Sequence, residues 1–355
     1  MALMGSKKLE VGILGATGMV GQRLASLLEY HPWFELKWLG ASDRSAGKPY
    51  AEACNWRLRE PMPVAARELS VHECVPNGNA PHLLFASLDG KVAGEVEGAF
   101  ARAGHAVVSN SSHYRMGEDV PLVIPEVNPD HLALVRTQRR ERGWNGMIVT
   151  NPNCTAVGLV MSLRPLLTAF GLSKVIMTSM QAVSGAGYPG VPTLDILGNV
   201  VPYIGGEEEK VQSETQKLLG SLTDGRVRPG DFAVSAHCNR VMVEDGHLET
   251  VSVALSTKAT RDDLLAAWRD FRPAPEVASL PSAPLRPIVV REELDRPQPK
   301  FDVNTEHGMA AVVGRVRPCP VLEYKYVVLS HNTIRGAAGA ALLNGELMKA
   351  GGYLD

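Results

Sequence analysis

A regular series of glycines near the start of the chain most constrains its fold. The apolar run 11–14 reads as a strand, and 19–30 reads as a helix. Between and around them, glycine recurs every third residue, at Gly12, Gly15, Gly18 and Gly21. Glycines at a strand-to-helix turn let the backbone approach a pyrophosphate, which binds at the helix N-terminus. The spacing is not the usual Gly-x-Gly-x-x-Gly, but the context predicts a dinucleotide-binding turn; the alternative is tight strand–helix packing without a ligand.

Strand-like and helix-like segments continue to alternate after this turn. Apolar runs at 34–40, 83–86 and 106–108 enclose a helix-like segment at 94–103. This alternation predicts a Rossmann-like, doubly wound parallel sheet with helices on both faces. A length of 355 residues predicts two domains.

The pattern of apolar residues changes after Cys154. Near-alternating apolar residues mark strands at 174–183, 233–243 and 247–255. Such strands predict an α+β domain with a mixed, largely antiparallel sheet that is covered on one face. The proline-rich stretch 273–299 reads as a surface connection, before a last strand at 325–329 and a small-residue-rich helix at 333–349.

Composition excludes several classes of partner. The net charge of −2 gives no reason to expect nucleic acid or an anionic membrane, and no apolar run is long enough to span a bilayer. The first ten residues do not read as a signal peptide. The five cysteines are scattered, odd in number and without a Cys-x-x-Cys pair, which argues against disulfides and metal sites and favours a reducing cytoplasm.

The loop after the second strand bears on the choice of dinucleotide. It reads Ser42-Asp43-Arg44-Ser45 and continues to Lys48. An acidic residue here favours the ribose hydroxyl of NAD, whereas an arginine accommodates the 2′-phosphate of NADP. The basic and hydroxyl side chains favour NADP; the alternative is a solvated polar loop that touches no cofactor.

Cys154 is the candidate nucleophile. It follows the strand-like run 147–150 and precedes a helix-like run at 156–170. A helix start favours the thiolate and is expected to lower the thiol pKa. The remaining cysteines read as space-filling residues: Cys54, Cys74, Cys238 and Cys319. His247, directly after Gly246 at a strand start, is a candidate proton carrier, although most such histidines are structural or exposed.

These features occur within a set of longer motifs that resembles the aspartate-β-semialdehyde dehydrogenase family, in the branch typical of archaea and fungi. The resemblance covers nearly the whole length. Its motifs are Gly-Ala-Thr-Gly-Met-Val-Gly (15–21), Ser-Asn-Ser-Ser-His-Tyr-Arg (109–115), Asn-Pro-Asn-Cys-Thr (151–155), Gln-Ala-Val-Ser-Gly-Ala-Gly (181–187), Gly-Gly-Glu-Glu-Glu-Lys (205–210), Arg-Val-x-Val-x-x-Gly-His (240–247) and Asn-Thr-Ile-Arg-Gly-Ala-Ala-Gly (332–339).

The resemblance implies a role for each catalytic and substrate-binding residue. Cys154 would be the nucleophile, His247 the acid/base, Gln181 the residue that orients the substrate, and Asn153 a group that assists the reacting oxygen. The substrate contacts would be Arg240 to the α-carboxylate, Glu207 to the α-amino group, and Arg115 with Lys210 to the phosphate. These side chains are the types that an aminoacyl phosphate requires, although alone each would read as a solvated charge.

The resemblance also implies the cofactor site and the domain limits. The cofactor residues would be Gly15, Thr17, Gly18, Met19, Val20, Ser42, Arg44, Ser45, Ser87, Ser184, Gly185 and Asn332. Residues 1–153 would form the dinucleotide-binding domain, completed by a C-terminal helix at 332–355, and 154–331 the catalytic and dimerisation domain. No metal is expected, and the assembly would be a homodimer or a dimer of dimers.

The implied reaction is the NADPH-dependent reductive dephosphorylation of L-4-aspartyl phosphate to L-aspartate 4-semialdehyde through a thioester on Cys154. This step belongs to the biosynthesis of lysine, threonine, methionine and isoleucine. Malonyl-CoA reductase, similar to the same branch, is an alternative, and N-acetyl-glutamyl-phosphate reductase is a weaker one because Glu207 suits a free amine. A dinucleotide-binding regulatory protein without turnover is an alternative of another class.

Overall fold

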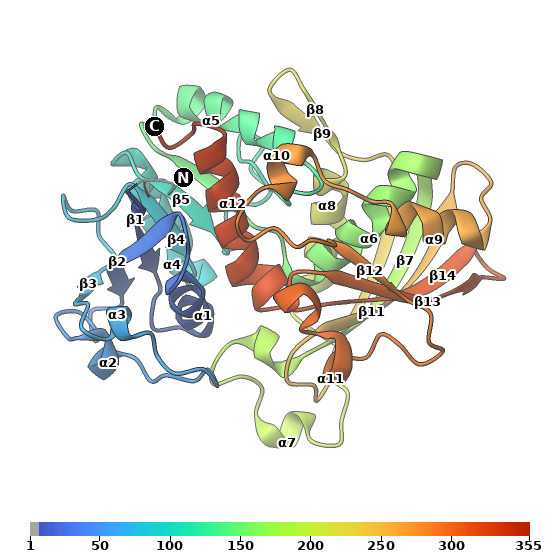
Figure 1. Cartoon of the computed structure of the whole chain (residues 1–355), viewed down its shortest axis with the longest axis horizontal. Coiled ribbons are helices and arrows are strands. Elements are labelled where there is room, and N and C mark those ends of the chain that lie inside the picture. Colours follow the sequence, from blue (N-terminus) through green and yellow to red (C-terminus); the bar gives the residue numbers. More distant parts are fainter. Residues whose placement is uncertain (1–6) are drawn as a thin grey trace, which may run out of the picture.

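The chain forms two domains, each built on a six-stranded sheet, as Figure 1 shows for a computed structural model that describes residues 7–355. The first sheet has the order β3-β2-β1-β4-β5-β6, and every neighbouring pair is parallel. This is the strand order of a doubly wound dinucleotide-binding fold. Its strands are β1 (Leu9–Leu14), β2 (Phe34–Ala41), β3 (Val71–Glu73), β4 (Leu83–Ala86), β5 (Ala106–Ser109) and β6 (Met147–Thr150).

Both faces of this sheet are covered, which explains why its strands are continuous apolar runs. In β4, Leu83 and Phe85 join one hydrophobic core, whereas Leu84 and Ala86 join another on the opposite face. The helices of this domain are α1 (Met19–Leu28), α2 (Tyr50–Ala53), α3 (Val64–Arg67), α4 (Gly90–Arg102) and α5 (Leu134–Arg142), with a 3-10 turn at Pro129–Ala133.

The second sheet is mixed, with the order β10-β7-β11-β14-β13-β12. Its inner pairs are antiparallel, and the two outermost pairs are parallel. Its strands are β7 (Leu172–Gln181), β10 (Ala233–Arg240), β11 (His247–Leu255), β12 (Ile288–Arg291), β13 (Ala311–Pro318) and β14 (Tyr324–Ser330); β8 (Ser221–Thr223) and β9 (Arg226–Arg228) form a separate ribbon. Both the doubly wound sheet and the mixed sheet were expected from the sequence.

Helices cover one face of the second sheet and form its core with residues from the strands. They include α6 (Cys154–Phe170), α8 (Glu207–Leu218) and α9 (Arg261–Arg269). The shorter helical segments are Val183–Ala186, α7 (Thr193–Ile196), α10 (Pro275–Ala278), α11 (Pro299–Asp302) and Thr305–Gly308. None of the helices in residues 7–355 has the length and apolar character needed to cross a membrane.

The prediction of a plain surface connection at 273–299 was wrong. This stretch contains α10 and the edge strand β12, whose Ile288 and Val289 are buried. The prolines flank the strand rather than interrupt it, and a proline beside an edge strand removes no ladder hydrogen bond. Sequence also gave no sign of β13, which pairs with β12 and β14.

The chain crosses between the domains at Cys154 and returns after β14. The return begins with a π-helical turn, η4 (Ile334–Ala338), and continues as α12 (Gly339–Ala350), where the sequence predicted one uniform helix. Residues of α12, including Leu343 and Met348, belong to the core of the first domain. In Figure 1 this red helix lies between the two sheets, so both crossings meet where the two domains adjoin.

Candidate active site

Cys154 and His247 lie together although they are far apart in sequence. Cys154 is the first residue of α6, which begins shortly after β6 ends at Thr150, and His247 is the first residue of β11. The distance from Cys154 Sγ to His247 Nε2 is 3.2 Å. On the other side of the ring, His247 Nδ1 accepts a hydrogen bond of 3.1 Å from the backbone N–H of Ala182. The pair therefore has the geometry of a thiol with a fixed imidazole partner.

The expected lowering of the Cys154 pKa was wrong. Burial raises the pKa of the Cys154 thiol to about 12, and the Glu207 carboxylate adds to that rise against Arg115 and Arg240. Burial, with help from Arg240 and His331, lowers the pKa of His247 to about 3. Desolvation disfavours both charged forms and outweighs the helix dipole. Both groups are therefore neutral near pH 7.

The start of α6 is capped by its own sequence. Asn153 Oδ1 accepts hydrogen bonds from the backbone N–H groups of Thr155 at 2.8 Å and Ala156 at 3.1 Å. Within the described residues, the backbone N–H of Cys154 itself has no acceptor. The helix start thus offers the N–H of Cys154 to a reacting oxygen, whereas the next two N–H groups are already bonded to Asn153. Asn153 acts as the helix cap and has no free amide oxygen for the substrate.

Glu207, the first residue of α8, is held by three side chains in the described structure. Its Oε1 accepts from Asn153 Nδ2 at 2.9 Å, Gln181 Nε2 at 3.2 Å and Thr155 Oγ1 at 3.4 Å. Gln181 also donates to Ser179 at 3.2 Å, so the amide of Gln181 is fixed beside the carboxylate. A buried carboxylate that accepts several hydrogen bonds is held in one orientation. Glu207 is thereby available to a cationic group.

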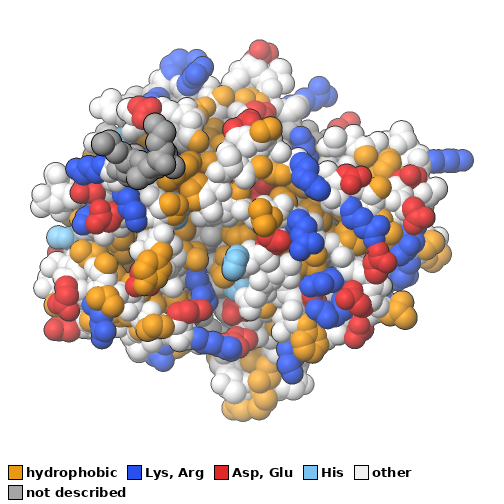
Figure 2. Space-filling view, viewed as in Figure 1, with side chains coloured by type: hydrophobic (Ala, Val, Ile, Leu, Met, Phe, Trp, Pro, Cys, Tyr) orange, Lys and Arg blue, Asp and Glu red, His pale blue; other side chains and the backbone are white. Residues whose placement is uncertain are grey.

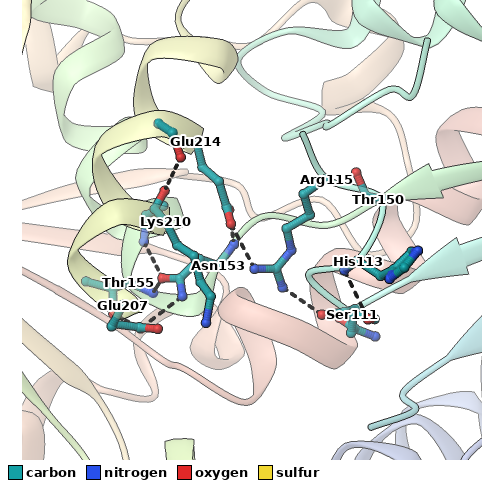
Figure 3. A network of polar contacts seen from close by, with 12 residues as sticks. Ser111, His113, Arg115, Thr150, Asn153, Thr155, Glu207, Lys210 and Glu214 are labelled. Atoms are coloured by element: carbon teal, nitrogen blue, oxygen red, sulfur yellow. Dashed lines mark hydrogen bonds and ion pairs between the residues drawn. The ribbon is translucent and has the colours of Figure 1, made fainter. Parts of the chain in front are cut away.

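Arg115 is paired within the protein, as Figure 3 shows for the network between α8 and the 110–115 segment. Its guanidinium donates to Glu214 Oε1 at 3.0 Å and to the backbone oxygen of Asn110 at 2.6 Å. The other oxygen of Glu214 accepts from the backbone N–H of Asn153 at 2.6 Å. Glu214 therefore connects the guanidinium to the residue that precedes Cys154. Lys210, one turn after Glu207, lines the cavity onto which Cys154 opens.

Arg240 lies at the end of β10 and is almost fully buried. One of its Nη atoms donates to the backbone oxygen of Ala182 at 2.8 Å. A Cβ added at Gly185 would lie 2.9 Å from Arg240 Nη1 and 3.1 Å from His247 Nε2. Glycine at this position therefore leaves room above both side chains, and the remaining guanidinium donors can face an anion.

A cavity of about 400 Å³ connects most of these residues; His247 and Glu214 lie behind its lining, against Cys154 and Arg115 respectively. It is lined by predicted catalytic and substrate residues together with predicted cofactor residues of both domains. The predicted residues along it are Met19, Val20, Ser87, Arg115, Asn153, Cys154, Gln181, Ser184, Gly185, Glu207, Lys210, Arg240 and Asn332. Asn332 donates to Ser184 Oγ at 2.8 Å and accepts from the backbone N–H of Gly246 at 2.8 Å, which fixes the far wall.

The glycine turn has the geometry of a pyrophosphate cradle. Gly15 has a φ of +81°, and a Cβ at Gly21 would lie 2.3 Å from the backbone oxygen of Gly15. Gly18 is the N-cap of α1 and provides no side-chain cap. The first N–H groups of α1, together with Thr17, therefore remain available to an anion.

The loop with Ser42, Arg44 and Ser45 lies after β2, outside the cavity just described. Asp43 accepts a hydrogen bond from the backbone N–H of Arg44 at 2.8 Å, and the residues Ser42 and Arg44 are exposed. Both the glycine turn and this loop fit an NADP-type dinucleotide. No group of three or more His, Cys, Asp or Glu residues within 7–355 is arranged to hold a metal ion.

Two residues of the site were missed from the sequence. Glu214 lies seven positions after Glu207, which is two helical turns and therefore the same face of α8; this spacing could have identified it. Gly336, in the π-helical turn, gave no such signal. A Cβ at Gly336 would lie 2.7 Å from Cys154 Cβ, so this glycine permits η4 to contact the cysteine.

Family models match both domains of the chain. The model described as semialdehyde dehydrogenase, NAD binding domain, matches residues 10–135, and semialdehyde dehydrogenase, dimerisation domain, matches residues 163–335. The aspartate-semialdehyde dehydrogenase of Methanothermobacter thermautotrophicus is 51% identical over 341 residues, with 95% of this chain and 98% of the relative covered. That of Schizosaccharomyces pombe is 46% identical over 346 residues, with coverage of 95% and 97%.

Solved structures agree with this similarity. The aspartate semialdehyde dehydrogenase of Candida albicans, crystallised with NADP, has a TM-score of 0.89 at 43% identity and covers 97% of this chain and 99% of its own. Aspartate semialdehyde dehydrogenase II of Vibrio cholerae, complexed with ASA, has a TM-score of 0.78 at 26% identity, with the same coverage.

Proposed function

The chain belongs to the aspartate-semialdehyde dehydrogenase family, and from this premise we propose that it reduces L-4-aspartyl phosphate to L-aspartate 4-semialdehyde with NADPH and releases phosphate. The observation that carries the proposal is the Cys154–His247 pair, 3.2 Å apart, whose cysteine lines a cavity with one buried carboxylate and several cations. One carboxylate and several cations are the charges needed to bind an acyl phosphate that also bears an amine and a carboxylate.

The substrate groups can be assigned to side chains by charge. Glu207, held by Asn153 and Gln181, receives the α-ammonium group. Arg240 binds the α-carboxylate through the guanidinium donors that Ala182 does not use. Arg115 and Lys210 bind the phosphate, and Glu214 offsets part of the positive charge of Arg115. A partly neutralised site can release phosphate more readily than two free cations could.

The reaction proceeds through an acyl group on Cys154. The sulfur attacks the acyl carbon as its proton passes to His247, the backbone N–H of Cys154 donates to the developing oxyanion, and phosphate departs. NADPH, when bound, supplies the hydride that reduces the resulting thioester. An acyl-thiol is an activated electrophile, whereas a free carboxylate is not readily reduced. His247 acts as the acid/base at the sulfur, and Arg240 with Glu207 hold the amino acid group in place during both steps.

The cofactor would lie across the two domains. Gly15, Thr17, Gly18, Met19 and Val20 would hold the pyrophosphate at the start of α1, and Ser42, Arg44 and Ser45 the 2′-phosphate. Near the thiol, the nicotinamide would contact Ser87, Ser184, Gly185 and Asn332, all of which line the cavity. A thiol nucleophile requires reducing conditions, which fits a place in the cytoplasm and in amino-acid biosynthesis.

The second domain presents an open surface that suits a homodimer. The sheet face opposite α6 carries Ile176, which is 42% exposed, and the partly buried Met180. The segment around α7 adds Tyr188, Leu194, Leu197 and Tyr203, which are 56–89% exposed. Figure 2 shows hydrophobic side chains at the lower edge, where Figure 1 places α7. Such apolar surface marks an interface, and the dimer is its proposed occupant; assembly into tetramers would use another surface.

The assignment is tested by measuring NADP reduction with aspartate semialdehyde and phosphate. We expect turnover that requires phosphate, with NAD about 10- to 100-fold less effective because it lacks the 2′-phosphate and its charged hydrogen bonds. Malonyl-CoA should not be reduced with NADPH, because a malonyl group has no amine for Glu207. Turnover of malonyl-CoA without phosphate-dependent oxidation of the semialdehyde would identify the alternative enzyme, and NADP binding without either reaction would identify a regulatory protein.

A further inference from the structure

Glu97 is a buried carboxyl behind the segment that carries Arg115. It lies on α4 and has no exposed surface. Its Oε1 accepts a hydrogen bond of 2.8 Å from Ser109 Oγ at the end of β5, whereas its Oε2 is buried without a partner among residues 7–355. A buried carboxyl with a single hydrogen bond has a charge that depends closely on its neighbours.

Hydrogen bonds connect Glu97 to the wall of the cavity. Ser109 Oγ also accepts from the backbone N–H of Ser111 at 3.1 Å, and Ser111 Oγ accepts from the backbone N–H of His113 at 3.3 Å. Figure 3 shows Ser111 and His113 in the same segment as Arg115, and both Ser111 and Arg115 line the cavity. The carboxyl of Glu97 is therefore joined to the segment that would bind phosphate.

The guanidinium of Arg115 has one carboxylate partner and one buried donor that remains free. Glu214 Oε1 accepts from Nη1 at 3.0 Å, while Nε of Arg115 is buried without a partner in the described part of the chain. Burial raises the pKa of Glu97 to about 7, against the hydrogen bond from Ser109 and the positive charge of Arg115, which lower it. The charge behind Arg115 can therefore change near neutral pH.

We propose that Glu97 couples phosphate binding at Arg115 to the uptake of a proton, so that its carboxyl is neutral while phosphate is bound and ionises when phosphate leaves. The inference deepens the proposed function and rests on it for the location of the phosphate. With Glu97 ionised, two carboxylates would weaken the attraction of the guanidinium for an anion; with Glu97 neutral, only Glu214 does so. The proton comes from water and returns to water, and Glu97 acts through Arg115 without touching the substrate.

The other groups around Glu97 leave Arg115 as its main charged neighbour. β5 (Ala-Val-Val-Ser) and β6 (Met-Ile-Val-Thr) present no titratable side chain. Burial raises the pKa of Tyr114, whose hydroxyl donates to a backbone oxygen of α4 at 2.6 Å, so Tyr114 is neutral in the same pH range. The ring of His113 lies against the same turn of α4, and Arg102 at the end of α4 acts on Tyr114.

Isothermal titration calorimetry of inorganic phosphate into the full-length, NADP-bound protein tests the coupling without turnover. The dissociation constant is measured between about pH 6 and 9, on either side of the pKa of Glu97, for the wild type and for Glu97→Gln, whose amide cannot ionise. Dividing the wild-type constant by that of the variant removes the ionisation of phosphate itself. We expect this ratio to rise from about 1 at the acidic end to about 5 or more at the alkaline end, the lower bound of typical couplings between sites.

Glu95→Gln is the matched control, because Glu95 lies on the same helix, two residues earlier, and is exposed. Solvent and salt screen its charge, so the control should bind phosphate as the wild type does at every pH. Equal binding by Glu97→Gln and wild type at the acidic end also shows that the variant retains an intact site. A ratio for Glu97→Gln that stays constant with pH, or an equal change for Glu95→Gln, would overturn the proposal.

Infrared spectroscopy gives a second readout. At about pH 7.5, where free wild-type protein is mostly ionised at Glu97, added phosphate should increase the band of a protonated carboxyl, and this increase should be missing from Glu97→Gln. Its absence from the wild type would contradict the proposal. A protein that shows the coupling but does not oxidise aspartate semialdehyde would defeat the proposed function alone, whereas turnover with a constant ratio would defeat only the coupling.

Discussion

Replacing Cys154 by alanine should lower kcat for phosphate-dependent oxidation of aspartate semialdehyde by about 10⁴-fold or more, a loss typical of a removed nucleophile. Without the sulfur, no thioester can form, and the remaining groups only bind the reactants. NADP binding should be retained, because the glycine turn and the Arg44 loop are separate from Cys154. Steady-state kinetics and fluorescence titration with NADPH measure the two effects.

Cys238→Ala is the matched control for this experiment. Cys238 is also buried, with 1% of its surface exposed, and it lies in β10 within the hydrophobic core of the second domain. Its replacement should reduce stability modestly and leave kcat close to wild type. Near-normal turnover by Cys154→Ala, or equal losses in the two variants, would contradict the assignment of Cys154.

Replacing Glu126 by glutamine should destabilise the protein by about 3–5 kcal/mol, the usual cost of leaving one partner of a buried ion pair without its counter-charge. Glu126 and Arg335 are both fully buried, and their two hydrogen bonds measure 2.6 and 2.7 Å. Arg335 is part of η4, and Glu126 lies just before the 3-10 turn at Pro129–Ala133. The pair therefore anchors the π-helical turn to the first domain. Urea unfolding monitored by circular dichroism measures the loss.

An exposed ion pair provides the comparison for Glu126. Glu292 pairs with Arg269, but both side chains are about half exposed. Glu292→Gln should change the free energy of unfolding by less than about 1 kcal/mol. A similarly small effect for Glu126→Gln would show that η4 is held by packing alone. Because Gly336 of η4 contacts Cys154, we also expect the damaged anchor to slow thiol chemistry.

Sequence predicted the two sheet types because each leaves a distinct pattern of apolar residues. A strand such as β4, buried on both faces, is a continuous apolar run, whereas β7 alternates between buried and exposed residues. Short edge strands such as β12 gave no comparable pattern, because neighbouring prolines and charges dominate their composition. The π-helical turn was also missed, since a local change of hydrogen bonding does not alter the small-residue composition of 333–349.

In the candidate site too, some features could be predicted from the sequence and others could not. Cys154 and His247 could be paired only through the family motifs. They are far apart in the sequence, and sequence spacing does not show that the fold brings the ends of β6 and β11 together. Glu214 could have been predicted from the helical periodicity of α8, which places it on the same face as Glu207. The pKa of Cys154 was predicted in the wrong direction because helix position is visible in a sequence, whereas burial and the approach of Glu207 are tertiary properties.

The central claim is that Cys154 carries the acyl group, and a single-turnover experiment tests it most directly. Aspartate semialdehyde and NADP are mixed with wild-type enzyme in the absence of phosphate, and NADPH is followed while the protein is analysed by mass spectrometry. We predict a burst of NADPH stoichiometric with active sites and an aspartyl adduct on the peptide that contains Cys154. Added phosphate should remove the adduct and allow NADPH formation to continue beyond the burst. NADPH formation that occurs only when phosphate is present, with no adduct on Cys154, would contradict the account.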